Sequence, residues 1–190
     1  MKKLCILLAI VLLLCLAACG PDPTPPVTEI PRTGANLSSD QIARQVFGPA
    51  NTLYRYFESY ALPKGGDMIQ QNGQIYWPVT DESPYQTMDE LTSALRGHFS
   101  EEIVQELLGR ELYISHEGHL YAIHAFKGRG HDPAFQGASF AIESESDDKI
   151  VYEVTKKMGY ENGVLTDEIV YYTRALQNGR WVFTNFDLLW

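Results

Sequence analysis

Four of the five histidines in the chain lie close together, and histidine is a common metal ligand. They are His116, His119, His124 and His131. Zinc peptidases place His-Glu-x-x-His on a helix, where both rings share one face. Here Glu117-Gly118 predicts a tight turn between two strands, so His116 should lie opposite His119. Strand alternation then puts His124 on the other face, across from Glu111. We therefore expect a solvent-exposed histidine pair and a Glu111–His124 contact rather than a metal site, and no cofactor.

The residue patterns of the common enzyme classes give little support for catalysis. The sequence has no Gly-x-Ser-x-Gly elbow and no phosphate-binding glycine pattern. A carboxylate pair for glycoside hydrolysis stays open, because its spacing is set by the fold. The acidic segment Glu143–Asp148 could bind calcium loosely, but a solvated strand edge is the favoured interpretation. We expect a protein that is not an enzyme.

The segment Lys127–Gly137, "KGRGHDPAFQG", is the candidate surface for binding a partner. It is long and glycine-rich and interrupts a β-rich region, as functional loops often do. The candidate contact residues are Lys127, Arg129, His131, Asp132 and Phe135. A mobile connection without contacts remains the alternative.

The N-terminus has the order of a secretory signal peptide, expected over residues 1–18. Lys2 and Lys3 precede an apolar run over residues 4–16, which is shorter than the roughly 20 residues of a membrane-spanning helix. The run ends in Leu16-Ala17-Ala18-Cys19, which resembles the bacterial lipobox, in which the cysteine is lipidated and becomes the new N-terminus. Cys19 is also the last cysteine of the chain, so a lipidated protein would keep no thiol for catalysis or disulfides. An ordinary signal peptide cleaved nearby is the alternative.

A proline-rich segment follows Cys19 and predicts a tether. Residues 19–36 include "GPDPTPPVTEIPRTG", which has little apolar surface to bury and favours extended polyproline conformations. We expect residues 37–190 to form one domain, held by the lipid at the extracytoplasmic face of the cell membrane. The sequence leaves the oligomeric state open.

The charge balance limits the partners. The chain has 24 acidic and 15 basic residues, a formal net charge of −9, and the basic residues are dispersed. Nucleic acid binding needs a basic patch, so it is disfavoured. Solubility is the simple explanation of the acidity, and steering toward a basic partner is the other.

Three helices are expected before the β-rich region. Ser38 with Gln41, and Thr87 with Glu90, form capping boxes, and Ser100 caps the third helix. Gly48-Pro49 should break or kink the first helix. Asn72-Gly73 predicts a hairpin between the first two helices, and Gly109 should end the third.

Antiparallel strands are expected from Glu111 onward. They are Glu111–His116, His119–Phe126, Ala138–Ser144, Lys149–Tyr160, Asp167–Gln177 and Arg180–Leu188, with turns at Glu117-Gly118, Asp147-Asp148, Asn162-Gly163 and Asn178-Gly179. In the last hairpin, Ala175 should face Val182, and Tyr171 and Ile169 should point into the core. This order predicts an α+β domain, with N-terminal helices packed on a curved antiparallel sheet that ends in a β-meander.

Three segments resemble the IseA family of DL-endopeptidase inhibitors. They are "HFSEEIVQELL" (His98–Leu108), "HLYAIHAFKGRG" (His119–Gly130) and "GRWVFTNFDLL" (Gly179–Leu189), and "YRYFESYALP" and "NGQIYWPVTD" fit the same order of elements. The resemblance covers roughly Ser38 to Trp190. It implies a non-enzymatic inhibitor of NlpC/P60-type cysteine peptidases, the cell-wall DL-endopeptidases that cut peptidoglycan stem peptides. The alternative is a lipoprotein that binds a small ligand in the concavity of the sheet.

Overall fold

The computed structural model describes residues 37–159 and 163–189. The chain divides into two compact units, Met1–Arg32 and Thr33–Trp190, and all described residues belong to the second. The signal peptide 1–18, lipidation of Cys19 and the tether 19–36 therefore lie outside the described residues and stay predictions, as does Asn162 of one predicted turn. Among the described residues, no helix has the length and apolar character needed to cross a membrane.

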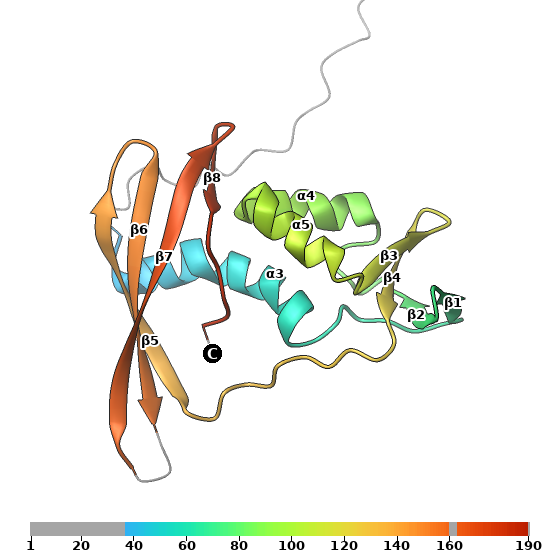
Figure 1. The fold of residues 1–190 in the computed structure, drawn as a ribbon, viewed down its shortest axis with the longest axis horizontal. Helices are drawn as coiled ribbons and strands as arrows, with labels where there is room; N and C mark the ends of the chain where they lie inside the picture. The colour runs from blue at the N-terminus through green and yellow to red at the C-terminus, as the bar shows by residue number, and fades with distance from the viewer. Residues whose placement is uncertain (1–36, 160–162, 190) are drawn as a thin grey trace, which may run out of the picture. The chain divides into compact units, whose positions relative to one another are not determined.

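The domain is α+β, as predicted, with helices first and a β-meander at the C-terminus (Figure 1). The helical segments are α2 (Ser39–Gln41), η3 (Ile42–Phe47), α3 (Gly48–Glu58), α4 (Met88–His98) and α5 (Glu101–Gly109). The strands are β1 (Ile69–Gln71), β2 (Gln74–Pro78), β3 (Tyr113–His116), β4 (His119–Ile123), β5 (Phe135–Glu145), β6 (Lys149–Gly159), β7 (Leu165–Gln177) and β8 (Arg180–Phe183).

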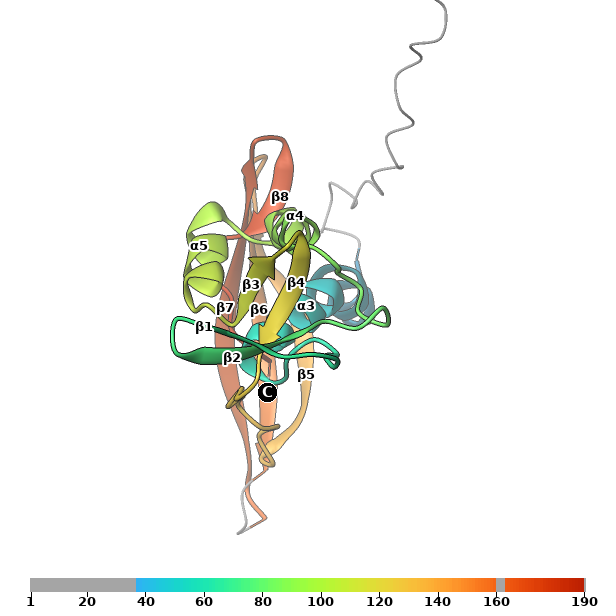
Figure 2. The same cartoon turned by 90° about the vertical axis from the view of Figure 1, so that its right-hand side faces the viewer.

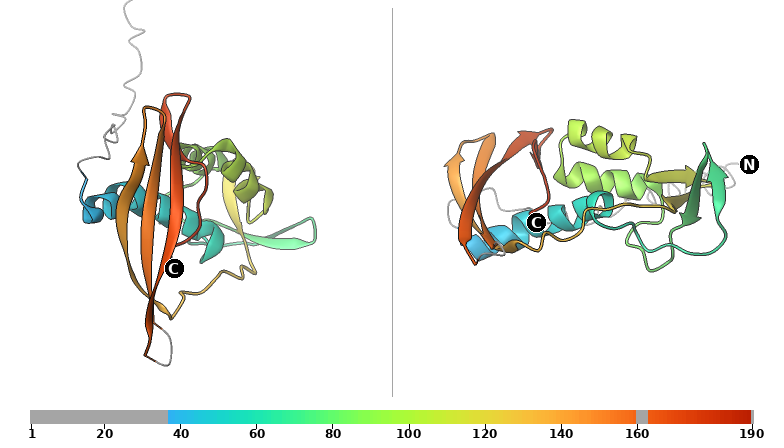
Figure 3. Two further views of the ribbon diagram at one scale, coloured as in Figure 1. Left: turned by 60° about the vertical axis from the view of Figure 1, so that its left-hand side comes forward. Right: turned by 60° about the horizontal axis from the view of Figure 1, so that its bottom comes forward.

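The strands form two antiparallel four-stranded sheets, in the orders β1-β2-β4-β3 and β5-β6-β7-β8. Figure 3 shows α3, α4 and α5 between the two sheets, and Figure 2 views the domain from the side of the β1-β2-β4-β3 sheet. The Asn72-Gly73 hairpin forms as predicted, with φ values of 51° and 77° that suit this dipeptide. The loop between β4 and β5 connects one sheet to the other.

The first helix begins where the sequence indicates but does not break at Gly48-Pro49. Both hydrogen bonds of the Ser38–Gln41 capping box are present. The segment η3 is a π-helix, and α3 follows it directly with Pro49 in its first turn. Proline and π-helical turns are both associated with irregular helix geometry, and here they lie next to each other. The predicted break is therefore wrong, but the helix does change from π-helical to α-helical geometry at Gly48.

The helices α4 and α5 begin after the predicted N-cap residues, but the side chain of Ser100, the N-cap of α5, makes no capping hydrogen bond. The Thr87–Glu90 capping box is confirmed. The helix α5 ends at Gly109, but the left-handed residue that turns the chain is Glu111, with φ of 54°. Gly109 is thus the last helical residue, as predicted, and the left-handed turn comes two residues later.

The curved β5-β6-β7-β8 sheet is filled on its concave face by aromatic side chains. Phe47 of η3 has its ring centroid 4.9 Å from that of Phe140, 5.4 Å from Tyr152, 5.2 Å from Tyr172 and 5.1 Å from Phe183. Such edge-to-face and tilted pairs stabilise a core beyond the area that they bury. This packing confirms helices on a curved sheet and fills the part of the concave face around Phe47.

The register of the last hairpin is as predicted, but its faces are reversed. Ala175 pairs with Val182 around the Asn178-Gly179 turn. Tyr172 and Arg174 are nevertheless buried, while Ile169 and Tyr171 are 53% and 48% exposed. The strand β8 ends at Phe183, five residues before the predicted end, and Phe47 of η3 packs on Tyr172 of the buried face.

Candidate functional site

The loop between β4 and β5 contains most of the predicted contact residues. Lys127, Arg129, His131 and Asp132 lie in this loop and are exposed. Phe135 is the first residue of β5, so the predicted loop Lys127–Gly137 was three residues too long at its C-terminal end. Between Ile123 and Phe135 the chain has neither helix nor strand, and its central part is extended (Figure 1).

The first half of the loop packs tightly against the C-terminal end of α3. A Cβ atom added to Gly128 would lie 2.1 Å from the carbonyl oxygen of Ser59, which no side chain could occupy without moving the backbone. The backbone N–H of Arg129 donates to the carbonyl oxygen of Glu58 at 2.5 Å. Glycine at 128 therefore permits a close approach of two backbone segments.

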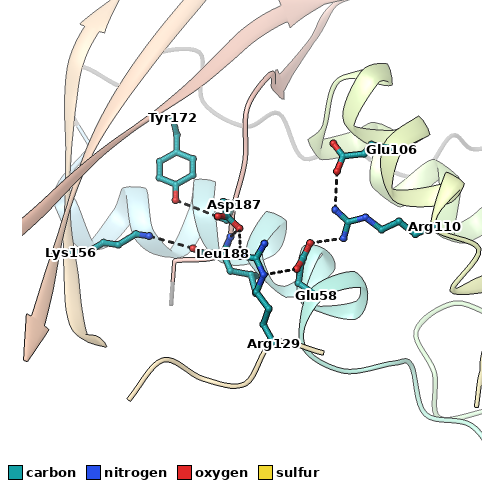
Figure 4. A network of polar contacts seen from close by, with 8 residues as sticks. All are labelled: Glu58, Glu106, Arg110, Arg129, Lys156, Tyr172, Asp187 and Leu188. Carbon is teal, nitrogen blue, oxygen red and sulfur yellow. Dashed lines mark hydrogen bonds and ion pairs between the residues drawn. The ribbon is translucent and has the colours of Figure 1, made fainter. Parts of the chain in front are cut away.

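The side chain of Arg129 joins the loop to two other segments (Figure 4). Its Nε lies 3.2 Å from Glu58 Oε2, and its terminal nitrogen lies 3.2 Å from Asp187 Oδ1. Glu58 is 8% exposed, and its other oxygen lies 2.5 Å from a guanidinium nitrogen of Arg110. Arg110 also pairs with Glu106 at 2.8 Å. A buried carboxylate requires such partners, because its desolvation is otherwise unfavourable.

The same network holds the C-terminal segment beside the meander. The hydroxyl of Tyr172 donates to the carbonyl oxygen of Asp187 at 3.3 Å, and Lys156 Nζ donates to that of Leu188 at 3.5 Å. Arg129 thus connects the loop, α3 and the C-terminal segment, and its guanidinium has a structural role. These contacts fix the first half of the loop within the domain, and its contact with a partner stays a prediction.

The second half of the loop forms a short turn that leads into β5. Asp132 Oδ1 accepts a hydrogen bond from the backbone N–H of Ala134 at 2.9 Å. The backbone carbonyl oxygen of Asp132 accepts one from the backbone N–H of Phe135. The rings of His131 and Phe135 meet edge to face with centroids 6.3 Å apart. Lys127 and His131 are therefore the exposed basic side chains on either side of the fixed Arg129.

The other histidines are placed as predicted in one respect and differently in another. His116 pairs with His119 across the β3–β4 turn. Glu111 lies before β3 in a left-handed conformation, so the predicted cross-strand pair of Glu111 and His124 does not form. The partner of His124 is Trp77, whose Nε1 donates a hydrogen bond to His124 Nδ1 at 2.8 Å. Within residues 37–159 and 163–189, no three His, Cys, Asp or Glu side chains are grouped to hold a metal ion.

The sequence analysis missed an open groove of about 620 Å³ along the first helix. One wall consists of Arg44, Gly48, Thr52 and Tyr56, and the other of Pro84, Tyr85 and His98. The residues of the helical wall recur every four positions, so the sequence does place them on one face of the helix. A glycine and a tyrosine on this otherwise polar face were the signal that could have indicated a groove. The opposite wall comes from a loop and from the end of α4, whose position the sequence does not indicate.

Side chains in the groove are largely uncharged. Burial, and then the positive charge of Arg174, lower the pKa of His98, which favours its neutral form near pH 7. Burial is the main reason that the pKa values of Tyr56 and Tyr85 are raised, so both hydroxyls stay protonated. The groove therefore presents aromatic surface with neutral hydrogen-bonding groups.

Comparison with known proteins gives no family for this chain. No protein-family model matches the sequence, and no curated protein matches it.

Proposed function

We propose that this chain is a lipid-anchored, non-catalytic inhibitor of NlpC/P60-type DL-endopeptidases at the extracytoplasmic face of the cell membrane. The proposal rests on the resemblance of three segments to the IseA family, joined to the signal for export and lipidation around Cys19. The loop between β4 and β5 is the proposed inhibitory element, with Lys127 and His131 as its contact side chains.

The observation that carries the proposal is that the first and the second of these separate segments each contact the third. Ser100, in the first, donates its backbone N–H to the carbonyl oxygen of Phe183, in the third, at 2.8 Å. Arg129, in the second, pairs with Asp187, in the third. The similar residues thus belong to one packed unit rather than to scattered surface positions, which supports descent from a common fold.

The loop also has the physical properties that an inhibitor of a peptide-cutting enzyme needs. It is extended and exposed, so it resembles a peptide in shape. Gly128 and Arg129 hold it against Glu58 and Ser59 before any partner arrives. Ordering the loop in advance reduces the entropy that is lost on binding. A peptidase groove blocked by this loop could not admit a stem peptide.

A lipoprotein that binds a small ligand is the second candidate function. Phe47 and its neighbours fill part of the concave face of the curved sheet, where the ligand was first expected. The groove along η3 and α3 is the observation that favours this candidate.

Inhibition of a purified DL-endopeptidase from the same host tests the proposal. The mature chain should slow the hydrolysis of muropeptides and should release no product alone. Changing Lys127→Glu together with His131→Ala should raise the inhibition constant at least tenfold, because it removes both contact side chains and leaves Arg129 in place. The matched control is Lys149→Glu in the β5–β6 hairpin, an exposed lysine for which we expect less than a twofold change.

Two results would contradict this function. One is the absence of inhibition at micromolar concentrations of the mature chain. The other is equal inhibition by the loop variant and the Lys149→Glu control, which would move the contact surface away from the loop. Replacing the whole loop is a poorer experiment, because it would also remove the ion pairs of Arg129 with Glu58 and Asp187.

A further inference from the structure

The groove along the first helix has walls from three separate elements. The helical wall spans Arg44 to Tyr56, roughly 15–18 Å at about 1.5 Å per residue. Gly48 lies one helical turn after Arg44 along this wall and adds no side chain to it. Pro84, Tyr85 and His98 face it from the other side. A long, open groove of this kind fits a linear ligand of several units better than a single compact molecule.

The groove is electrically neutral although the chain as a whole is acidic. Arg44 is its one charged lining residue among those described, and Asp40 pairs with this arginine one helical turn away. No carboxylate of the described residues lines the groove. An anionic ligand would therefore find no uncompensated cation, and a cationic ligand would find no anion. Charge matching favours an uncharged ligand.

Neutral hydrogen-bonding groups are available in the groove. No described residue hydrogen-bonds to the hydroxyl of Tyr56, Tyr85 or Thr52. The rings of Tyr56 and Tyr85 are perpendicular, with centroids 6.4 Å apart. A ligand in the groove can therefore contact the face of one ring and the edge of the other. Tyrosine offers an apolar ring with a polar tip, which suits a ligand that also combines apolar faces with hydroxyl groups.

We propose that this groove binds an uncharged oligosaccharide, with sugar rings against Tyr56 and Tyr85 and sugar hydroxyls bonded to the tyrosine, threonine and histidine groups. Sugars combine C–H faces that pack on aromatic rings with hydroxyl and acyl-amino groups that need neutral partners. If the proposed function holds, the natural ligand is the glycan strand of the cell wall. Binding of a sugar chain as such does not depend on that function.

Calorimetric titration of the mature chain with the β-1,4-linked tetramer of N-acetylglucosamine tests the proposal. The tetramer should bind, and Tyr85→Ala should weaken binding at least tenfold, because it removes a ring from the groove. Tyr85→Phe should weaken it about fivefold, because it removes only one neutral hydrogen bond. The control is Tyr171→Ala on the outer face of the β5-β6-β7-β8 sheet, a tyrosine that is 48% exposed, and should change affinity less than twofold.

A second variant guards against misfolding of Tyr85→Ala. Thr52 is exposed on α3, so Thr52→Arg should fold and should obstruct the groove. Loss of tetramer binding in Thr52→Arg with an unchanged circular dichroism spectrum supports the proposal. Three results overturn it: no binding of the tetramer at millimolar concentration, equal binding by Tyr85→Ala and Tyr171→Ala, or binding of a stem peptide without sugar in place of the tetramer. Since no peptidase is present, these results are independent of the inhibition assay.

Discussion

Glu58 is a buried carboxylate at the C-terminal end of α3, and arginines from two distant parts of the chain supply its counter-charges. Arg129 was predicted from the sequence as a partner contact, and the structure shows in addition that its guanidinium pairs internally with Glu58 and Asp187. Residues 58 and 129 are far apart along the chain, and no local pattern relates them. The groove along the first helix was missed for the same reason, because its second wall comes from a separate part of the chain.

Removing Arg129 tests the structural role of the network. The Arg129→Ala variant should lower the free energy of unfolding by about 1–3 kcal/mol, because Glu58 loses one of its two charged partners while it stays buried. Urea denaturation followed by circular dichroism measures the change. Arg44→Ala is the matched control, since its ion pair with Asp40 is solvent-exposed and should contribute less than about 0.5 kcal/mol. A difference between the two variants within experimental error would show that Arg129 is dispensable for folding.

Structural features that depend only on residues close together in the sequence were predicted well. The capping boxes at Ser38 and Thr87 and the tight turns at Asn72-Gly73 and Asn178-Gly179 depend only on neighbouring residues, and all of them form. The face that β7 buries was predicted wrongly, because it depends on η3, which is distant in the sequence. Local chemistry therefore predicted where elements begin and turn, while their covering partners required the three-dimensional fold.

The junction between α4 and α5 offers a test at the scale of elements. Hydrogen bonds from Arg96, and then from Gln105, lower the pKa of the Glu101 carboxyl to about 2 from an ordinary value of 4.5. The ionised carboxylate therefore contributes stability that is present above about pH 4.5 and is lost as the pH falls toward 2. Carbon-detected NMR titration should report the low pKa in the native chain.

The variant Arg96→Gln should return the pKa of Glu101 toward 4.5, because its largest hydrogen-bonding contribution is gone. Arg44→Gln, on another helix, is the control and should leave the titration of Glu101 unchanged. Both side chains of the Arg96–Glu101 pair are about half exposed, so only a small change in the free energy of unfolding is expected at pH 7. A native Glu101 that titrates near 4.5 would mean that this pair does not persist in solution.

At the scale of the whole molecule, the proposals depend on where the chain resides. The acidic composition and the α+β domain suit many locations, whereas the segment that ends at Cys19 indicates export and a lipid anchor. A lipid on Cys19 would hold both the loop and the groove near the membrane, within reach of the newest part of the wall. Inhibition and sugar binding would then be restricted to that zone.

Lipidation is tested by labelling the full-length chain with radioactive palmitate in a bacterial host. The wild type should incorporate the label and should sediment with the membrane fraction, since two or more acyl chains give stable attachment. Cys19→Ser should lose both properties, because the thiol that accepts the lipid is absent. Cys15→Ser is the matched control: Cys15 lies within the apolar run rather than after Leu16-Ala17-Ala18, so this variant should keep the label and the membrane association. Equal labelling of the two variants, or no label in the wild type, would show that Cys19 is not the anchor, and the site of inhibition and sugar binding would have to be sought away from the membrane.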